Sequence, residues 1–336
     1  MEGRVNTSGV LWLWLVAAVV ALGAVAVASV TFGARDVAWA DVLAALSGAG
    51  DTLAQAAVAK RIPRTILAML VGAALGLAGA VMQGLTRNPL ADPGLLGVTS
   101  GASLAVVTGI AFFSLASATS IAWVAILGAG ASAVFVYIVG SLGRGGATPL
   151  KLALAGAAVS AAFGSLISAI MLPRIQAMDS FRFWQIGGVG GASLERTGQM
   201  LPFLVVGALL CLACARGLDS LALGDDLAAG LGENVLRVRI IAAAGAVLLC
   251  GATTAAAGPV GFVGLVVPHA CRLLAGPAHR RLLPLSAVVG AVLLTGADVL
   301  GRIVARPDEI DVGIITALIG APVFVAIVRR QKARAL

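Results

Sequence analysis

The sequence predicts an all-α polytopic membrane protein. Of its 336 residues, 60% are hydrophobic and 11% are charged, and the mean hydropathy is +1.04. A soluble domain of this size could not hide so much apolar surface, whereas a membrane span needs about 20 apolar residues to cross about 30 Å of hydrocarbon. The chain therefore has room for about ten spans, in a single transmembrane domain over residues 1–336, and for little else.

Ten hydrophobic segments can be marked along the chain. The first is too long and too apolar for the h-region of a signal peptide, so we interpret it as an uncleaved span. Among the small residues that favour close helix packing in lipid, Gly72 and Gly76 form a GxxxG pair. The segments are Val10–Thr31, Thr65–Leu85, Leu95–Leu115, Ile121–Leu142, Leu152–Leu172, Leu201–Ala215, Ile240–Ala257, Gly258–Val267, Leu282–Leu300 and Ile314–Val328.

The stretch Ile240–Val267 is ambiguous, because glycine and proline interrupt it after Ala257. It could be one long helix, or a full span followed by the half-length segment Gly258–Val267, and in either case Pro268 is expected to end it. With the N-terminus inside, ten crossings place most lysine and arginine residues in the cytoplasm, whereas nine crossings place most of them outside. The positive-inside rule therefore favours ten transmembrane helices with both termini in the cytoplasm.

This orientation assigns the longer connections to the two sides of the membrane. Outside, Asp36–Lys60 is expected to contain a surface helix, and Asp179–Thr197 forms a second segment that is aromatic and then glycine-rich. Inside lie the turn Arg87–Gly97, which we interpret as structural, and the polar stretch Ser220–Arg239. The apolar side of the outer surface helix would carry Trp39, Leu43 and Leu46.

The polar stretch contains the pattern of a short helix. Asp225 and Asp226 suit a helix N-terminus, where negative charge is stabilised. Leu227 and Leu231 are four residues apart and would share one face, and Gly232 is a plausible stop. A helix of about two turns is not stable in water on its own, so we expect this segment to dock onto a partner.

The sequence lacks an energy source of its own. No glycine precedes Lys60, Lys151 or Lys332, so the chain has no Walker A loop with which to hydrolyse ATP. Asp298 is an acidic residue within a late span, and its spacing from Arg302 favours an intrahelical ion pair near the outer end over an ion or proton site. These features indicate a passive translocation path that is coupled to another component.

No metal, cofactor or nucleic-acid partner is indicated. His269 and His279 are both expected in the inside loop after Pro268, and the C-x-x-C of Cys211 and Cys214 lies in an apolar run, where small packing residues are the favoured interpretation over redox or metal chemistry. The net charge of +8 comes from basic residues scattered among hydrophobic runs, which is typical of loop charge that sets orientation.

Several motifs, in order along the chain, resemble the FecCD-type permeases of type II ABC importers, which carry iron-siderophores, haem or cobalamin. The match runs from about residue 60 to residue 324, and the motifs are highly specific only when taken together. They are Arg61-Ile-Pro-Arg64-Thr, Gly79-Ala-Val-Met-Gln83-Gly, Asn88-Pro-Leu-Ala-Asp92-Pro-Gly-Leu-Leu-Gly97, Leu221-Ala-Leu-Gly224 with Leu231-Gly232, Gly261-Phe-Val-Gly264-Leu-Val-Val-Pro268-His269, Arg272-Leu, Ala297-Asp298 and Gly320-Ala-Pro322-Val-Phe324.

The resemblance implies a translocation subunit of the cytoplasmic membrane, not an enzyme. Two permeases, identical or paralogous, would surround a central path, with a separate dimeric ATPase beneath them and a substrate-binding protein outside. The cargo implied is a ferric siderophore, with haem or cobalamin as alternatives. An ion-coupled secondary transporter is the alternative from another functional class. No cofactor is implied for this chain, since ATP would bind to the partner subunit.

The resemblance also implies roles for particular residues. Residues 225–232 would form the coupling helix that sits in a groove of the ATPase. Leu227 and Leu231 would be its packing face, and His269 and Arg272 would lie near the ATPase or else end a helix at the lipid headgroups. The full set assigned to ATPase coupling is Asp225, Asp226, Leu227, Leu231, Gly232, Glu233, His269 and Arg272.

On the outer side, Arg61, Arg64 and Arg302 match positions at which related permeases face acidic residues of the binding protein. Arginine suits such contacts because its guanidinium group can pair with a carboxylate through two hydrogen bonds. The alternative is that the three arginines anchor helix ends at the headgroups. The lining of the path is poorly readable, and the following candidates are equally consistent with packing: Met82, Gln83, Ser160 and Ser168.

Overall fold

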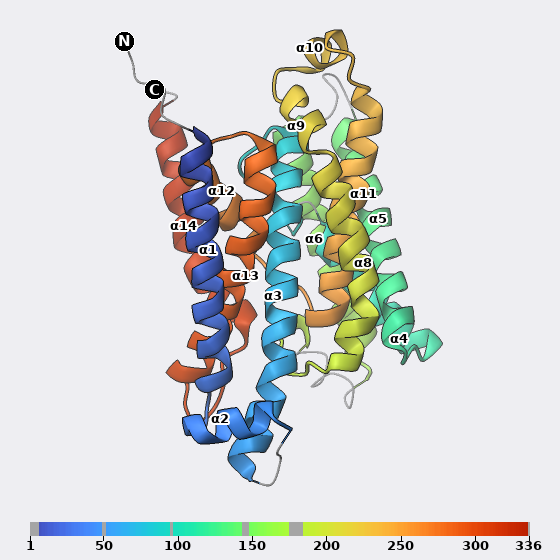
Figure 1. Ribbon diagram of the computed structural model, residues 1–336. Helices are drawn as coiled ribbons and strands as arrows, with labels where there is room; N and C mark the ends of the chain where they lie inside the picture. The colour runs from blue at the N-terminus through green and yellow to red at the C-terminus, as the bar shows by residue number, and fades with distance from the viewer. Residues whose placement is uncertain (1–6, 49–51, 95–96, 143–147, 175–183, 335–336) are drawn as a thin grey trace.

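The computed structural model describes residues 7–48, 52–94, 97–142, 148–174 and 184–334. Within these ranges the chain is helical and has no β-strand, and the long helices run roughly side by side in one bundle (Figure 1). The helices are α1 Thr7–Thr31, α2 Trp39–Leu46, α3 Leu53–Thr86, α4 Val98–Phe113, α5 Ala118–Ser141, α6 Pro149–Met171, α8 Leu194–Ala213, α9 Ala215–Leu221, α10 Asp225–Gly230, α11 Val235–Ala257, α12 Val263–Ala275, α13 His279–Val304 and α14 Val312–Arg334.

Eight of the described helices are long and apolar enough to cross a membrane: α1, α3, α5, α6, α8, α11, α13 and α14. Two shorter apolar helices, α4 and α12, correspond to the predicted spans Leu95–Leu115 and Gly258–Val267. Several helices begin before the predicted segments, and α3 begins at Leu53 rather than at Thr65. The described part of the structure thus contains eight full-length candidate spans, and the total of ten crossings stays a prediction.

The prediction that Pro268 ends the helix is wrong. Helix α12 begins at Val263 and continues through Pro268 to Ala275. Proline has no N–H, so the carbonyl oxygen of Gly264, four residues earlier, loses its usual partner. The side-chain amide of Gln83 on α3 donates to this oxygen at 3.2 Å. A hydrogen bond from a neighbouring helix therefore replaces the missing one and lets α12 continue.

The two ends of the bundle differ. Helix α10 lies at the same end as the first turn of α1 and the last turn of α14, and we call this the α10 end (Figure 1). The opposite end carries α2 and is called the α2 end. This placement of α1 and α14 is consistent with an even number of crossings. That the α10 end faces the cytoplasm remains a prediction of the positive-inside rule.

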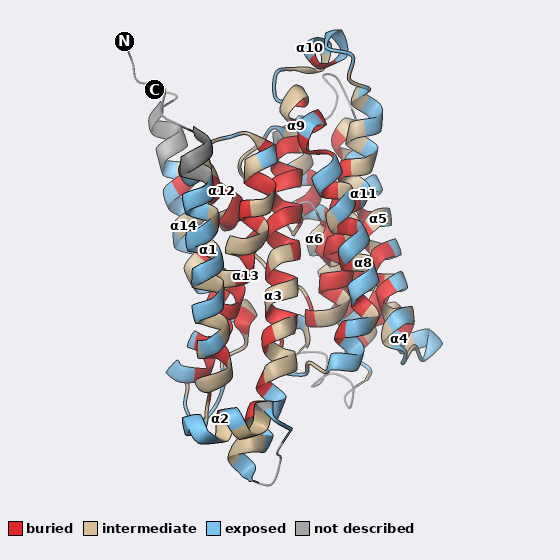
Figure 2. Ribbon diagram, in the orientation of Figure 1, coloured by how far each residue is buried: buried red, intermediate tan, exposed pale blue. Residues whose placement is uncertain are grey.

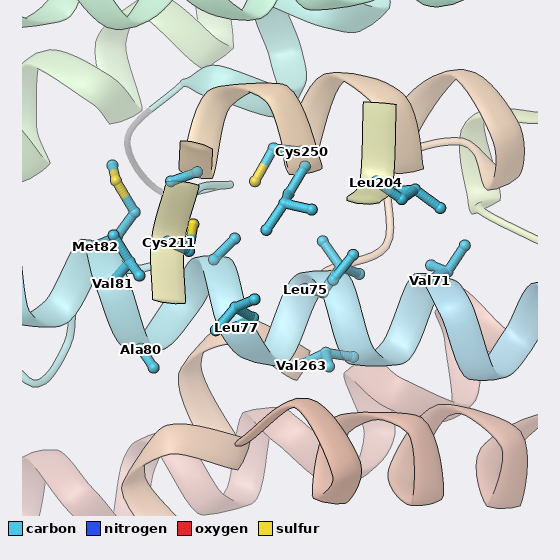
Figure 3. Close-up of a cluster of buried hydrophobic side chains, with 14 of the residues drawn as sticks. Val71, Leu75, Leu77, Ala80, Val81, Met82, Leu204, Cys211, Cys250 and Val263 are labelled. Atoms are coloured by element: carbon cyan, nitrogen blue, oxygen red, sulfur yellow. The ribbon is translucent and has the colours of Figure 1, made fainter. Parts of the chain in front are cut away.

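Helix α3 is the centre of the bundle. It is the most buried of the long helices, and Figure 2 shows burial along most of its length. Figure 3 shows Val71, Leu75 and Met82 of α3 in the apolar cluster that also contains Cys211 of α8 and Cys250 of α11. The four cysteines of the chain are buried, and Cys211 and Cys214 lie in the apolar core cluster, as expected for packing residues.

Helix α2 is the predicted surface helix. It follows a Thr31–Ala38 connection and lies across the α2 end of the bundle (Figure 1). Val42 is buried against the bundle, whereas Trp39 and Leu43 are exposed. An exposed aromatic and aliphatic pair on a surface helix suits the interface between lipid and water.

Candidate functional site

Helix α9 packs against the α10 end of the bundle, and α10 protrudes beyond it (Figure 1). The turn between them depends on Gly224, whose φ of 117° is strongly disfavoured for residues with a Cβ. Helix α10 ends in a Schellman motif, in which Gly232, at φ 85°, donates to the carbonyl oxygen of Ala229 at 2.9 Å and Glu233 donates to that of Ala228 at 3.0 Å. The predicted stop at Gly232 is therefore confirmed, although the helix itself ends at Gly230.

The two leucines of this segment point away from the rest of the chain. Ala228 is fully buried and holds α10 against its surroundings, while Leu227 and Leu231 are 62% and 66% exposed. Leu223, just before the turn, is exposed as well. Because these leucines are exposed, they bury little apolar surface within the chain itself. They form an apolar surface that another protein could cover.

The two aspartates of α10 are in different environments. The Asp225 carboxylate accepts hydrogen bonds from Arg239 of α11, at 2.9 and 3.1 Å, and from Arg87, the C-cap of α3. Asp226 is exposed to solvent. Of the two aspartates assigned to ATPase coupling, Asp226 is therefore presented outward, and Asp225 is bound within the chain. No sequence pattern indicated that Arg87 or Arg239 would contact this aspartate.

A second polar contact connects α9 to α13. The Asp219 carboxylate accepts a hydrogen bond from the backbone N–H of His279 at 2.6 Å and lies 2.9 Å from its Nδ1. His279 is the first residue of α13 and is 5% exposed, and its Nε2 atom is buried near the backbone of Gly84. The prediction that His279 lies in a loop is wrong, because Asp219 caps the start of α13 and draws the histidine into the bundle.

The predictions for His269 and Arg272 are corrected in the same way. Both residues lie within α12 rather than in a loop after Pro268. The guanidinium group of Arg272 is turned towards α3, where it donates to Oε1 of Gln83. Gln83 thus joins Arg272 to the free carbonyl of Gly264 and is itself buried. These hydrogen bonds favour the packing interpretation of Gln83.

At the α2 end, Asp298 is the centre of a buried charge cluster. Its carboxylate pairs with Arg302 on its own helix at 2.9 Å, which confirms the predicted ion pair. A guanidinium nitrogen of Arg64 on α3 lies 2.8 Å from the same carboxylate, and no sequence pattern predicted this contact. Asp298 and Arg302 are 0% and 1% exposed, and Arg64 also contacts Glu309 in the connection to α14.

The remaining donors of these arginines bind main-chain carbonyls near the end of α1. Arg302 donates to the carbonyl oxygens of Ser29 and Phe32 at 2.9 and 3.2 Å. Arg61, also buried, donates to the carbonyl oxygens of Val30, Thr31 and Arg35. The structure thus brings Arg61, Arg64 and Arg302 to the same end of the bundle but turns them inward. Their hydrogen bonds hold α1, α3 and α13 together, which disfavours the predicted role in docking a binding protein.

A cavity of about 670 Å³ also lies towards the α2 end. It is bounded by α3, α4, α5, α8, the end of α11 and the Trp184–Ser193 segment, and its lining is mostly apolar. Arg196 and Asp311 are the charged residues in the lining, and burial raises the pKa of the Asp311 carboxyl group. Within the described ranges, no group of three histidine, cysteine or acidic side chains could hold a metal ion. The predicted external segment Asp179–Thr197 lies partly outside the described residues.

Comparison with known proteins identifies the family. The chain matches the FecCD transport family over residues 10–330. It is 39% identical over 320 residues to YfiZ of Bacillus subtilis, named as a probable siderophore transport system permease, with 95% of this chain and 96% of that protein covered. It is 43% identical over 305 residues to the ferric enterobactin permease FepD of Escherichia coli, with 90% of this chain and 91% of that protein covered. It is 40% identical over 277 residues to the cobalamin permease BtuC of Halobacterium salinarum, covering 82% and 74%.

A solved structure has the same fold. The structure, described as a metal-chelate type ABC transporter in an inward-facing conformation, superimposes with a TM-score of 0.78 at 30% sequence identity and covers 94% of this chain and 98% of that one. The helix lengths, the fold and the sequence comparisons all indicate a membrane permease of one family. The chain is a multi-pass protein of the cytoplasmic membrane and belongs to the FecCD transport family.

Proposed function

We propose that this chain is the permease subunit of an ATP-driven importer that moves ferric siderophores across the cytoplasmic membrane. The observation that carries the proposal is the exposure of Leu227 and Leu231 on α10, at the end of the bundle where α1 begins and α14 ends. The sequence has no Walker A loop, so ATP hydrolysis must be supplied by another protein, and a rigid helix with an apolar face can dock onto it. The family match favours this function over ion-coupled secondary transport.

The α10 helix would dock into a groove of a dimeric ATPase. Leu227 and Leu231 would enter the groove, with Asp226 as an outward polar contact and Glu233 at the edge. The Schellman motif at Gly232 fixes the end of the helix, so the leucine face moves with the backbone of the whole segment. Asp225 and Arg272 are hydrogen-bonded within the chain, so we expect them to shape this end and not to contact the ATPase directly. We expect the same of His269, which lies on α12.

A second permease copy, identical or paralogous, would complete the translocation path. Helix α6 presents a face of small exposed residues, which permits close approach of another helix in the membrane. The exposed face of α14, with Leu318 and Val325, is a further surface that a second copy could cover. Exposed residues on the α6 face include Ala153, Ala157, Ala158, Ala161, Ala162 and Ser165.

An extracytoplasmic binding protein would dock at the α2 end and deliver the cargo. We place its acidic contacts on the exposed cations Lys60 and Arg196. Arg61, Arg64 and Arg302 are disfavoured for this contact because their guanidinium groups are already hydrogen-bonded within the chain. A charge on the rim of an interface mainly affects the rate of association and its salt dependence.

The cargo can be tested directly. Relatives at similar identity are named for ferric enterobactin and for cobalamin. The experiment therefore compares ferric chelates with haem and cobalamin as cargo. Radiolabelled ferric catecholate, ferric hydroxamate, haem and cobalamin are offered to a strain that lacks the chromosomal copy, with and without the chain. We expect restored uptake of a ferric chelate. Restored uptake of cobalamin or haem alone would contradict the assignment to siderophores but not the permease function.

A further inference from the structure

The docking helix α10 is held by ion pairs to two spanning helices, and this arrangement assigns a role to Asp225. The carboxylate lies at the first turn of α10, and Gly224, the N-cap, supplies no side-chain hydrogen bond. Arg87 ends α3, and Arg239 lies in the second turn of α11. One carboxylate therefore joins α10 to the next helix, α11, and to the end of α3, 138 positions away. It accepts charge-assisted hydrogen bonds from both arginines.

The helix that Arg87 ends is joined to the rest of the bundle by close backbone contacts. A Cβ atom placed on Gly76 of α3 would lie 2.3 Å from the carbonyl oxygen of Ser286 of α13, and one placed on Gly79 would lie 2.0 Å from the carbonyl oxygen of Gly264 of α12. Helices in such contact cannot slide independently. A displacement of α10 that reaches α3 through Arg87 therefore reaches α12 and α13 too.

We propose that Asp225 is a positioning residue that, with Arg87 and Arg239, transmits the movement of α10 to α3 and α11. The proposal rests on the proposed function, since it assumes that an ATPase moves α10. The carboxylate and both guanidinium groups are about 40% exposed, a setting in which ion pairs add little to folding stability. Removing the carboxylate should therefore leave the permease folded while loosening α10 from the helices that α10 must move.

The first test measures α10 in the permease alone. A nitroxide is attached at Ala229→Cys, an exposed position on α10, in lipid nanodiscs; the four native cysteines are buried. Asp225→Asn and Arg239→Gln should both increase the mobility of the nitroxide. The matched controls are Asp226→Asn, the exposed neighbour, and Arg237→Gln, an exposed arginine on the same helix as Arg239. Unchanged mobility in Asp225→Asn would overturn the proposal, and because no ATPase is present this result does not depend on the proposed function.

The second test separates positioning from direct contact. In proteoliposomes that contain the ATPase and the binding protein, Asp225→Asn should retain ATPase binding and ATP hydrolysis. Cargo moved per ATP hydrolysed should fall at least about fivefold, the lower end of typical coupling between sites. Asp225→Glu, which keeps the charge, should restore the ratio. The double variant Asp225→Asn with Arg239→Gln should be no worse than the poorer single variant, because both changes break one contact.

A different set of results would show that Asp225 contacts the ATPase directly. If Asp225→Asn weakened ATPase binding while Arg239→Gln left binding and transport unchanged, Asp225 would be a contact residue and the proposal would be wrong. A wild-type permease that binds no ATPase would instead overturn the proposed function. In that case the nitroxide measurement still decides whether Asp225 holds α10.

Discussion

Gly72 of α3 and Gly290 of α13 meet backbone to backbone. A Cβ atom on Gly72 would lie 2.3 Å from the carbonyl oxygen of Gly290, and a Cβ on Gly290 would lie 2.2 Å from that of Gly72. Such distances are far inside van der Waals contact, so only glycine fits at either position. The contact fixes α3 and α13 as a unit that extends from the α10 end, through Arg87 and His279, to the buried charge cluster around Asp298.

Alanine at Gly72 or Gly290 should therefore destabilise the protein. The added methyl group must separate two helix backbones, and overpacking of this kind costs about 1–3 kcal/mol. Gly164 of α6 is the matched control, because a Cβ there meets no atom within 4 Å. Thermal unfolding in detergent should show a lower midpoint for Gly72→Ala and Gly290→Ala and no decrease for Gly164→Ala. Equal midpoints for all three variants would argue against the close contact.

The buried carboxylate of Asp298 gives a second prediction. Asp298→Asn leaves the charges of Arg64 and Arg302 without their shared partner, and breaking a buried ion pair from one side costs about 3–5 kcal/mol. Asp36→Asn is the control, since Asp36 pairs with Arg306 but its side chain is 91% exposed. An exposed pair contributes only about 0–1 kcal/mol. Denaturant unfolding should separate the two variants clearly, and similar losses in both would contradict the burial of the Asp298 cluster.

The leucine face of α10 gives a third prediction. Leu227→Asp with Leu231→Asp should abolish association with the ATPase and uncouple ATP hydrolysis from uptake. The fold should survive, because both side chains are exposed within the chain. Leu227→Met with Leu231→Met keeps an apolar face of similar volume and should retain both activities. Co-purification of the ATPase and cargo uptake are the measurements, and unchanged transport by the aspartate variant would show that α10 is not the docking helix.

Docking at the α2 end gives a fourth prediction. Lys60→Glu and Arg196→Glu should weaken binding of the extracytoplasmic protein and reduce its salt dependence, because both cations are exposed. Arg61→Gln removes three hydrogen bonds to main-chain carbonyls and should instead lower stability. Affinity measured at low and high salt distinguishes the two effects. A folded Arg61→Gln variant with weakened docking would restore the role that the sequence resemblance implied for this arginine.

Local sequence patterns predicted the parts of the site that depend on nearby residues. The stop at Gly232 follows from the ability of glycine to adopt positive φ, and the pairing of Asp298 with Arg302 follows from their spacing on one helix face. The hydrophobic segments located the spans because membrane thickness fixes their length. These features need no knowledge of how the helices pack.

Contacts between distant helices could not be predicted in this way. Arg64 reaches Asp298 across 234 positions and Arg87 reaches Asp225 across 138 positions, and both contacts depend on which helix faces lie together. The continuation of α12 past Pro268 failed as a prediction for the same reason, because the replacement hydrogen bond comes from Gln83 on α3. The three predicted docking arginines are turned inward, because most of their hydrogen-bond acceptors belong to other segments.

We propose that movement driven by ATP enters the membrane through this chain. The most direct test is uptake of a radiolabelled ferric siderophore by proteoliposomes that contain the permease, its ATPase and its binding protein. We predict uptake that requires ATP and is lost both in the Leu227→Asp and Leu231→Asp double variant and in vesicles without the ATPase. Uptake driven by an ion gradient in vesicles that contain the permease alone would contradict the account.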